Sequence, residues 1–119
     1  MAGRKNGGPD DDLPGEERDP LERVFDALRD PIRRRILAAL VGGGGPIDEE
    51  AIVSSVDGGS RDVRRFRIDL VHVQLPKLER MGYVEWVPGV AVRPGPRFEE
   101  VEPVVELLLE HEDALPVGL

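Results

Sequence analysis

Arginine is concentrated in two short segments of the chain, RDPIRRR at residues 29–35 and RDVRRFR at residues 61–67. Each segment carries a net charge of +3 within a chain of 119 residues and net charge −8, so the remainder carries −14. Guanidinium groups form paired hydrogen bonds with phosphate oxygens, and an acidic protein can meet nucleic acid through a local basic surface. We expect phosphate contacts from Arg33, Arg34, Arg35, Arg61, Arg64 and, further along the chain, Lys77. The alternative is that these cations pair with the abundant carboxylates as solvated surface ion pairs, each worth little.

The second basic segment opens a long helical pattern over residues 61–81. Ile68, Val71, Leu75 and Leu78 recur at intervals of three and four residues, which predicts a stripe facing the core. The opposite side could read base edges. Arg can form two hydrogen bonds with guanine, Gln can form two with adenine, and Val can contact the methyl group of thymine. The predicted base-reading residues are Arg65, Asp69, His72, Val73 and Gln74. The alternatives are a polar surface role for His72 and a core or partner contact for Val73.

Proline and glycine mark where the elements begin and end. Asp19–Pro20 and Asp30–Pro31 each combine an N-cap with a proline at the first helical position. Pro76 removes an intrahelical hydrogen bond and crowds the carbonyl four residues back, which predicts a kink or break before Leu75. The expected elements are helices over 19–29, 30–41, 48–56 and 99–112, a short strand at 46–47, and a hairpin of strands 83–87 and 90–93. The third helix should turn Ala51, Ile52 and Val56 inward.

One domain with one small core is expected from this length, and its class is mostly α with a small β-hairpin (α+β). Residues 1–18 are rich in Gly, Pro and charge and nearly free of apolar side chains, so we predict a disordered acidic tail. The folded domain should span residues 19–97, and residues 98–119 should form a C-terminal helix and tail.

Two stretches of sequence carry a family resemblance. FDALRDPIRRRILAAL (25–40) resembles the opening of ArsR-like winged-helix regulators, and VHVQLPKLERMGYVEW (71–86) resembles the end of their recognition helix running into the wing. The second stretch is most similar to small ArsR-like domains common in halophilic archaea, and the resemblance spans residues 22–93. It implies a winged helix-turn-helix with an added C-terminal helix, and a sequence-specific DNA-binding transcriptional regulator whose partner is double-stranded DNA.

The chain departs from that family at two points. The Cys or His clusters with which metal-sensing members bind ions are absent, and the segment DGGSRD before the long helix is short. The acidic, Arg-rich, Lys-poor composition agrees with a salt-loaded cytoplasm, although an acidic protein from a GC-rich genome would look the same. Beyond the hairpin, Arg93 and Arg97 would either reach the minor groove or solubilise a loop.

Surplus apolar surface on the last predicted helix indicates a partner. Three consecutive leucines, at 107–109, cannot all face one small core. Together with the first helix they predict a homodimer interface made of Leu21, Val24, Val104, Val105, Leu108 and Leu109. The alternative is a terminal helix that only covers its own core. A protein–protein interaction module on the same scaffold, without DNA binding, is the alternative function.

Composition argues against other functions. A chain without Cys and with two His has no disulfide, thiolate metal site or cysteine nucleophile and does not favour a zinc site. GGGGP lacks the Lys and Ser or Thr of a phosphate loop, and adjacent acidic pairs point to different sides of a helix. We therefore expect neither enzyme activity, nor a cofactor, nor a metal. No apolar run is long enough to cross a bilayer and no signal peptide is indicated, so a cytoplasmic location is expected.

Overall fold

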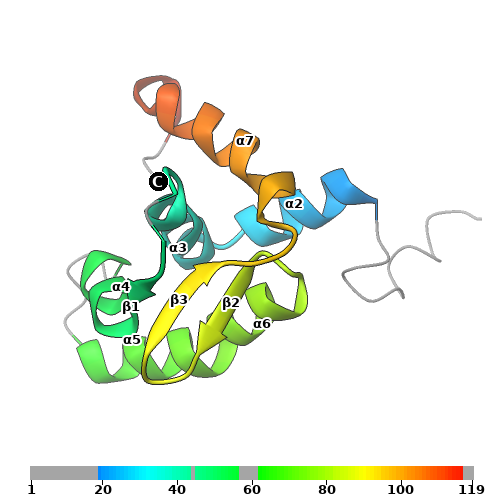
Figure 1. Ribbon diagram of the computed structural model, residues 1–119. Helices are drawn as coiled ribbons and strands as arrows, with labels where there is room; N and C mark the ends of the chain where they lie inside the picture. The colour runs from blue at the N-terminus through cyan, green and yellow to red at the C-terminus, as the bar shows by residue number, and fades with distance from the viewer. Residues whose placement is uncertain (1–18, 44, 57–61, 117–119) are drawn as a thin grey trace, which may run out of the picture.

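The computed structural model describes residues 19–43, 45–56 and 62–116. The predicted tail at 1–18, the predicted turn at 57–60 and Arg61 lie outside the described residues. Figure 1 shows the arrangement of the elements. In chain order they are α2 (Pro20–Leu28), α3 (Pro31–Leu40), β1 (Ile47–Asp48), α4 (Glu49–Val56), α5 (Val63–Asp69), the π-helical turn η2 (Leu70–Gln74), α6 (Leu75–Arg80), β2 (Val84–Val87), β3 (Ala91–Pro94), α7 (Phe98–Glu110) and the 3-10 turn η3 (Glu112–Ala114).

Both Asp-Pro pairs start helices as predicted. The Asp19 carboxylate accepts a hydrogen bond from the Leu21 backbone N–H at 3.2 Å. The Asp30 carboxylate accepts from the backbone N–H of Ile32 at 2.8 Å and of Arg33 at 3.3 Å. Each cap satisfies backbone donors that have no partner within the helix. The local sequence therefore places the boundary between α2 and α3.

The sheet has three antiparallel strands in the order β1-β3-β2. The predicted hairpin is formed by β2 and β3, in which Trp86 pairs with Val92. The predicted short strand is β1, and it pairs with the other side of β3, where Ile47 is opposite Val92. Glu49, the first residue of α4, fixes the hairpin turn. One of its carboxylate oxygens accepts from Trp86 Nε1 and from the Gly89 backbone N–H, both at 2.8 Å. The hairpin is thus held to the helical part by a buried acid.

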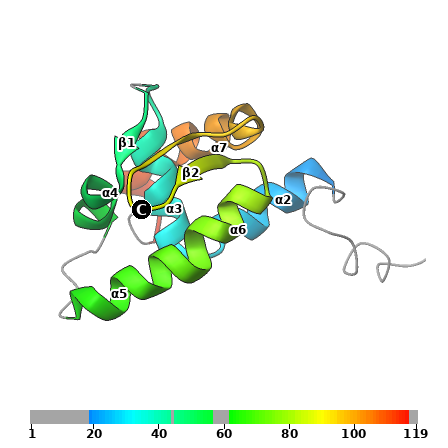
Figure 2. The ribbon, with the colours of Figure 1, turned by 60° about the horizontal axis from the view of Figure 1, so that its bottom comes forward.

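The sequence predicted a kink or a break before Leu75, and the structure has an irregular turn there but no break over residues 63–80. α5, η2 and α6 run on as one rod (Figure 2). The turn before the proline widens instead, and the Leu75 N–H donates to the Leu70 carbonyl, five residues back. Pro76 has no N–H and its ring crowds the His72 carbonyl, so a π-turn is a way to pass the proline without leaving the helix.

The π-turn changes which side chains enter the core. One extra residue in a turn rotates the preceding part of the helix by about 100° relative to a regular α-helix. Leu70 is therefore buried where Val71 was expected, while Ile68, predicted to face the core, is 52% exposed. Leu75 and Leu78, which follow the turn, are buried as predicted.

The remaining helices close the core over the sheet and the long helix. α7 packs on α2 and α3 and buries Val101 and Val105. In α4 the inward residues are Ile52, Val53 and Val56, and Ala51, predicted to face inward, is exposed. The result is a compact, mostly helical domain with a small antiparallel sheet, which confirms the predicted α+β class. Within the described ranges, none of the helices is both long and apolar enough to span a membrane.

Candidate nucleic-acid interface

The first arginine segment turns inward, which corrects the expectation that it offers phosphate contacts. Arg33 is 8% exposed and donates from Nε to the Ala27 carbonyl at 3.0 Å and from Nη2 to the Asp26 carbonyl at 2.8 Å. Arg34 donates from Nη1 to the Leu28 carbonyl at 2.6 Å. These carbonyls belong to the last turn of α2, where backbone acceptors lack helical partners and the helix dipole favours a cation.

Arg35 follows the same pattern at a different helix. Its Nη1 lies 3.5 Å from the carbonyl of Val56, the last residue of α4, and its side chain is half-buried. Three consecutive arginines of α3 thus approach carbonyl oxygens at the carboxyl ends of two other helices. The charge pattern suggested phosphates or surface carboxylates as their partners, and backbone carbonyls were not expected.

Gln74 is also buried, so it cannot read bases as predicted. Its side chain is 5% exposed, and its Oε1 accepts from Arg33 Nη1 at 3.0 Å. Its Nε2 donates to Asp69 at 3.1 Å and lies 3.5 Å from Asp30. Asp69 is accordingly half-buried and engaged with Gln74. Gln74 lies four residues before the buried Leu78 and thus on the same side of the helix.

Lys77 is held by an acid rather than presented to solvent. Its Nζ lies 3.3 Å from the Asp26 carboxylate, which also pairs with Arg29 at 2.9 Å. Burial opposes ionisation of Asp26, but hydrogen bonds and charge from Lys77 and Arg29 outweigh it and lower the pKa of Asp26 below its ordinary value. Lys77 is about one-third exposed, so its predicted phosphate contact would compete with this ion pair.

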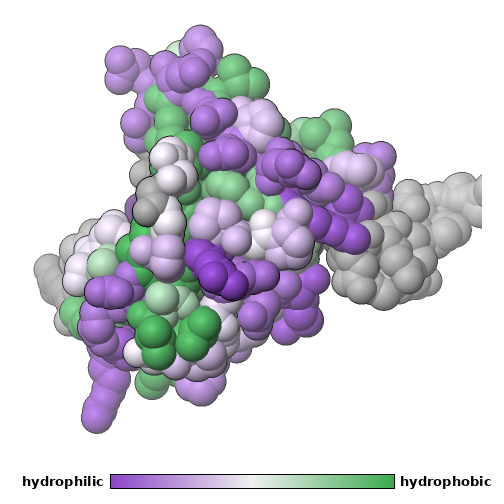
Figure 3. Space-filling model, viewed as in Figure 1, coloured by the Kyte–Doolittle hydropathy of each residue, from purple (hydrophilic) through white to green (hydrophobic). Residues whose placement is uncertain are grey.

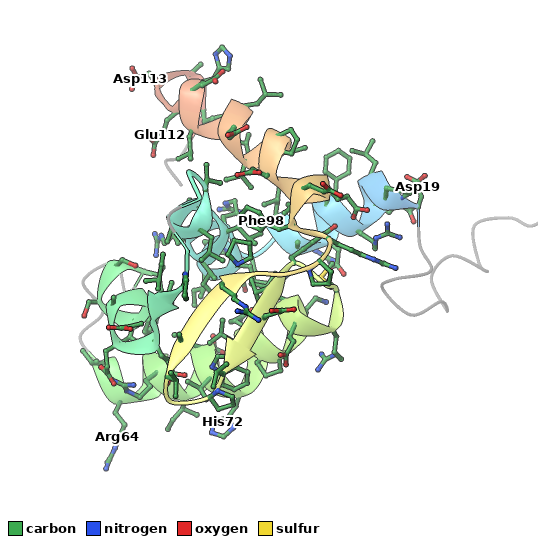
Figure 4. All side chains as sticks on the ribbon, viewed as in Figure 1. Asp19, Arg64, His72, Phe98, Glu112 and Asp113 are labelled. Carbon is green, nitrogen blue, oxygen red and sulfur yellow. The ribbon has the colours of Figure 1, made fainter. Side chains whose placement is uncertain are left out.

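Between Val63 and Gln74, five side chains of the long helix are exposed. We call them the reading face: Arg64, Arg65, Ile68, His72 and Val73. Arg64 and His72 project from the lower edge of the molecule, away from its body (Figure 4). Neither Arg64 nor Arg65 has a side-chain hydrogen bond or ion pair within the part of the chain that the structure describes. Arg67, by contrast, pairs with Glu50 at 2.6 Å, as the surface ion-pair alternative predicted.

A shallow groove of about 340 Å³ borders this face. It lies between the start of α3 and α5 and is lined by Ile32, Asp62, Arg65, Phe66 and Asp69. Asp62 caps α5 by accepting from the Arg65 backbone N–H at 3.0 Å. The groove is lined by two acids, Asp62 and Asp69, and by one arginine, Arg65. The two arginines of the reading face, Arg64 and Arg65, both lie in the first turn of α5.

The hairpin contributes apolar rather than basic surface. Val87 and Val90, at its turn, are more than half exposed, and hydrophobic surface appears at the lower edge of Figure 3. Arg93 pairs with Glu85 across the two strands at 2.6 Å. The Arg97 side chain lies over Gly82, where an added Cβ would come within 3.1 Å of it. Arg93 is thus committed to an intrachain ion pair and Arg97 packs on its own chain.

The predicted dimer residues divide between core and surface. Val24 and Val105 are buried in the domain's own core, which corrects their assignment to an interface. Val104, Leu108 and Leu109 are half-buried and Leu21 is exposed. Two strongly exposed side chains on the same helices, Phe25 and Leu107, were not among the predicted residues. A shallow groove of about 230 Å³ between α2 and α7 is lined by Pro20, Leu21, Val24, Glu100 and Val104.

A buried polar contact joins α2, α7 and Tyr83, the residue before β2. Arg23 pairs with Glu100 through two hydrogen bonds, of 2.6 and 3.1 Å, and the Tyr83 hydroxyl donates to the same carboxylate at 2.5 Å. The hydrogen bond from Arg23 lowers the pKa of Glu100 against the opposing effect of burial. Burial, together with Glu100, raises the pKa of Tyr83. This contact fixes α7 against the rest of the domain.

Among the described residues, no group of three or more His, Cys, Asp or Glu side chains is arranged to hold a metal ion. No family model, curated protein or solved structure matches this chain. The reading face and the elements that hold it are therefore the basis for a functional proposal.

Proposed function

We propose that this protein is a winged helix-turn-helix transcriptional regulator that binds duplex DNA by placing the reading face in the major groove. The observation that carries the proposal is a long helix packed against a β-hairpin through α6 and β2, with Arg64 and Arg65 exposed and unpaired within the described residues. A helix of this kind fits the width of the major groove. Resemblance of residues 25–40 and 71–86 to ArsR-like regulators supports the same proposal.

The distribution of cations sets how the protein would contact phosphates. Arg33 and Arg34 are occupied by backbone carbonyls, so they do not contribute. Arg64 and Arg65 lie in the first turn of α5, whose N-terminal end is capped by the Asp62 carboxylate. Phosphate binding is thus concentrated at one end of the helix, while His72 and Val73 lie further along it within reach of base edges.

We further propose that two chains pair through α2 and α7. Leu21, Phe25 and Leu107 are exposed on these two helices, and hydrophobic surface appears over both of them in the upper part of Figure 3. An exposed aromatic side chain and an apolar groove on the same helices can complement their copies across a two-fold axis. Such a dimer would present two reading faces to two half-sites.

The test is a titration of the protein against duplex DNA from its own upstream region at several salt concentrations. Each phosphate contact releases a condensed counterion, so the logarithm of affinity falls by about 0.9 per decade of salt for each contact. The variant Arg64→Gln/Arg65→Gln should weaken binding to all sequences and reduce this slope by about two. Arg80→Gln is the matched control, because Arg80 is exposed at the opposite end of the same helix, about 24 Å away.

Two outcomes would reject the proposal: absence of wild-type binding even at low salt, or an affinity and slope that the double variant leaves unchanged. The protein–protein interaction module would then take its place. Val63, Ile68 and Val73 on the long helix and Val87 and Val90 on the hairpin favour that second function, because exposed apolar side chains suit a protein partner. Capture of a partner that is lost in Ile68→Asp but retained in Arg64→Gln would support it.

A further inference from the structure

We propose that the reading face recognises thymine through its 5-methyl group, with Ile68 and Val73 as the two contacting side chains. The inference rests on the proposed DNA binding and adds to it the class of base that is read. It depends on the π-turn, because a regular α-helix would keep Ile68 in the core. Here Ile68 is 52% and Val73 50% exposed, although both are apolar.

Helical spacing places these side chains next to the groups that would hold the DNA. Arg64, Ile68 and His72 are four residues apart, so they form one row along the outer side of the helix. The two labelled ends of this row, Arg64 and His72, project in the same general direction from the lower edge of the molecule (Figure 4). Ile68 lies between them, and Val73 is one residue beyond His72.

The chemistry of the row matches one feature of the major groove. Thymine is the only base of unmodified DNA that presents a methyl group there, and apolar side chains recognise it by contact. Asp69, the acid next to Ile68 in the sequence, is half-buried and accepts a hydrogen bond from Gln74, so its carboxylate is engaged within the chain. Amide or carboxylate side chains that could read adenine or cytosine by hydrogen bonds are absent from the reading face.

The two arginines of the reading face favour DNA over an apolar protein surface as its binding partner. Arg64 begins the row and Arg65 lies beside it, both without side-chain partners within the described residues. A duplex supplies phosphates for these two cations and methyl groups for Ile68 and Val73 at the same time. A protein partner would have to supply both acidic and apolar groups in this order.

The experiment begins with selection of binding sites from a pool of randomised duplexes at low salt. The enriched site is then made in two forms, one with thymine and one with deoxyuridine at every thymine position. The two forms have the same charge and the same hydrogen-bonding edges and differ only in the methyl groups. Wild-type protein should bind the deoxyuridine form more weakly, by roughly fourfold for each methyl group that Ile68 or Val73 contacts.

Two variants complete the test. Ile68→Ala/Val73→Ala should bind both forms with similar affinity and keep the wild-type salt slope, because Arg64 and Arg65 are unchanged. Val90→Ala, at an apolar position on the hairpin that is slightly more exposed than Ile68 and Val73, should keep the full preference for thymine. Thermal unfolding of each variant verifies that it is folded.

The outcomes separate this inference from the proposed function. Salt-dependent binding by the wild type with equal affinity for both forms would overturn thymine recognition and leave DNA binding intact. A double variant that still prefers thymine as strongly as the wild type would also overturn it. Failure of the wild type to enrich or bind any duplex at low salt would reject the proposed function, and this inference with it.

Discussion

Arg33 Nη1 donates a hydrogen bond of 3.0 Å to Gln74 Oε1, and both side chains are buried although they lie 41 residues apart in the chain. Through its other nitrogens Arg33 holds the last carbonyls of α2, and through its amide Gln74 contacts Asp69. The pair thus connects the end of α2, the start of α3 and the π-turn. It orients the long helix whose outer side is the reading face.

Gln74→Ala should destabilise the domain by about 1–3 kcal/mol, because it leaves a buried guanidinium N–H and the Asp69 carboxylate without their partner. Urea-induced unfolding measures the change. The control is His72→Ala, an exposed neighbour on the same turn, for which we expect a change within about 0.5 kcal/mol. Equal effects of the two substitutions would show that the Arg33–Gln74 contact contributes nothing to stability.

Pro76→Ala should leave the fold intact and change its stability by no more than about 1 kcal/mol, in the stabilising direction if the new N–H finds a helical partner. Leu70 and Leu75 occupy the core on both sides of the π-turn, so packing should hold the turn in place. Circular dichroism and thermal unfolding check both statements. Pro103→Ala in α7 is the comparison, as a second proline inside a helix. Unfolding of the Pro76 variant would mean that the proline itself maintains an essential turn.

Acid should weaken the domain through Glu100. The pKa of Glu100 is lower in the folded protein than in the unfolded chain, so its contribution is complete above its ordinary pKa of about 4.3 and is lost as the pH falls through the lower, folded value. Glu100→Gln should be less stable than the wild type at neutral pH and lose less stability between about pH 6 and about pH 3.

The pH dependence should shrink in that variant without vanishing, because the pKa of Asp26 is also lowered in the folded state. Tyr83→Phe is the control, since it removes one donor to Glu100 and keeps the ion pair with Arg23. Denaturant titrations at a series of pH values supply the free energies of unfolding. Parallel pH profiles for the wild type and Glu100→Gln would contradict the assignment.

The wild-type chain of 13.1 kDa should scatter light as a particle of twice that mass in molar salt. Leu107→Lys should give the mass of one chain, because a charge would be buried at the α2–α7 face while the isolated helix tolerates Lys near its carboxyl end. Val90→Lys introduces the same charge at the hairpin turn and should remain a dimer. A wild type that stays monomeric at high concentration would remove the dimer from the proposal.

The sequence alone determined where most elements begin and what class of fold they make. Asp19–Pro20 and Asp30–Pro31 act through hydrogen bonds to residues two or three positions away, so local sequence is sufficient to place them. The hairpin is equally local, because its turn residues and alternating strands are adjacent in the chain. The exposure of Arg65, His72 and Val73 also followed from the helical pattern.

Only the tertiary structure decided which of the other candidates face solvent. Pro76 was recognised as an interruption, but the choice between a break and a π-turn depends on burying both Leu70 and Leu75, which is a packing requirement across the whole domain. That choice turned Leu70 inward and Ile68 outward. The partners of Arg33 are carbonyls at the end of a neighbouring helix, and their position is set by how α2 and α3 cross. The sequence shows where the arginines are, but it does not show which backbone carbonyls the fold places next to them.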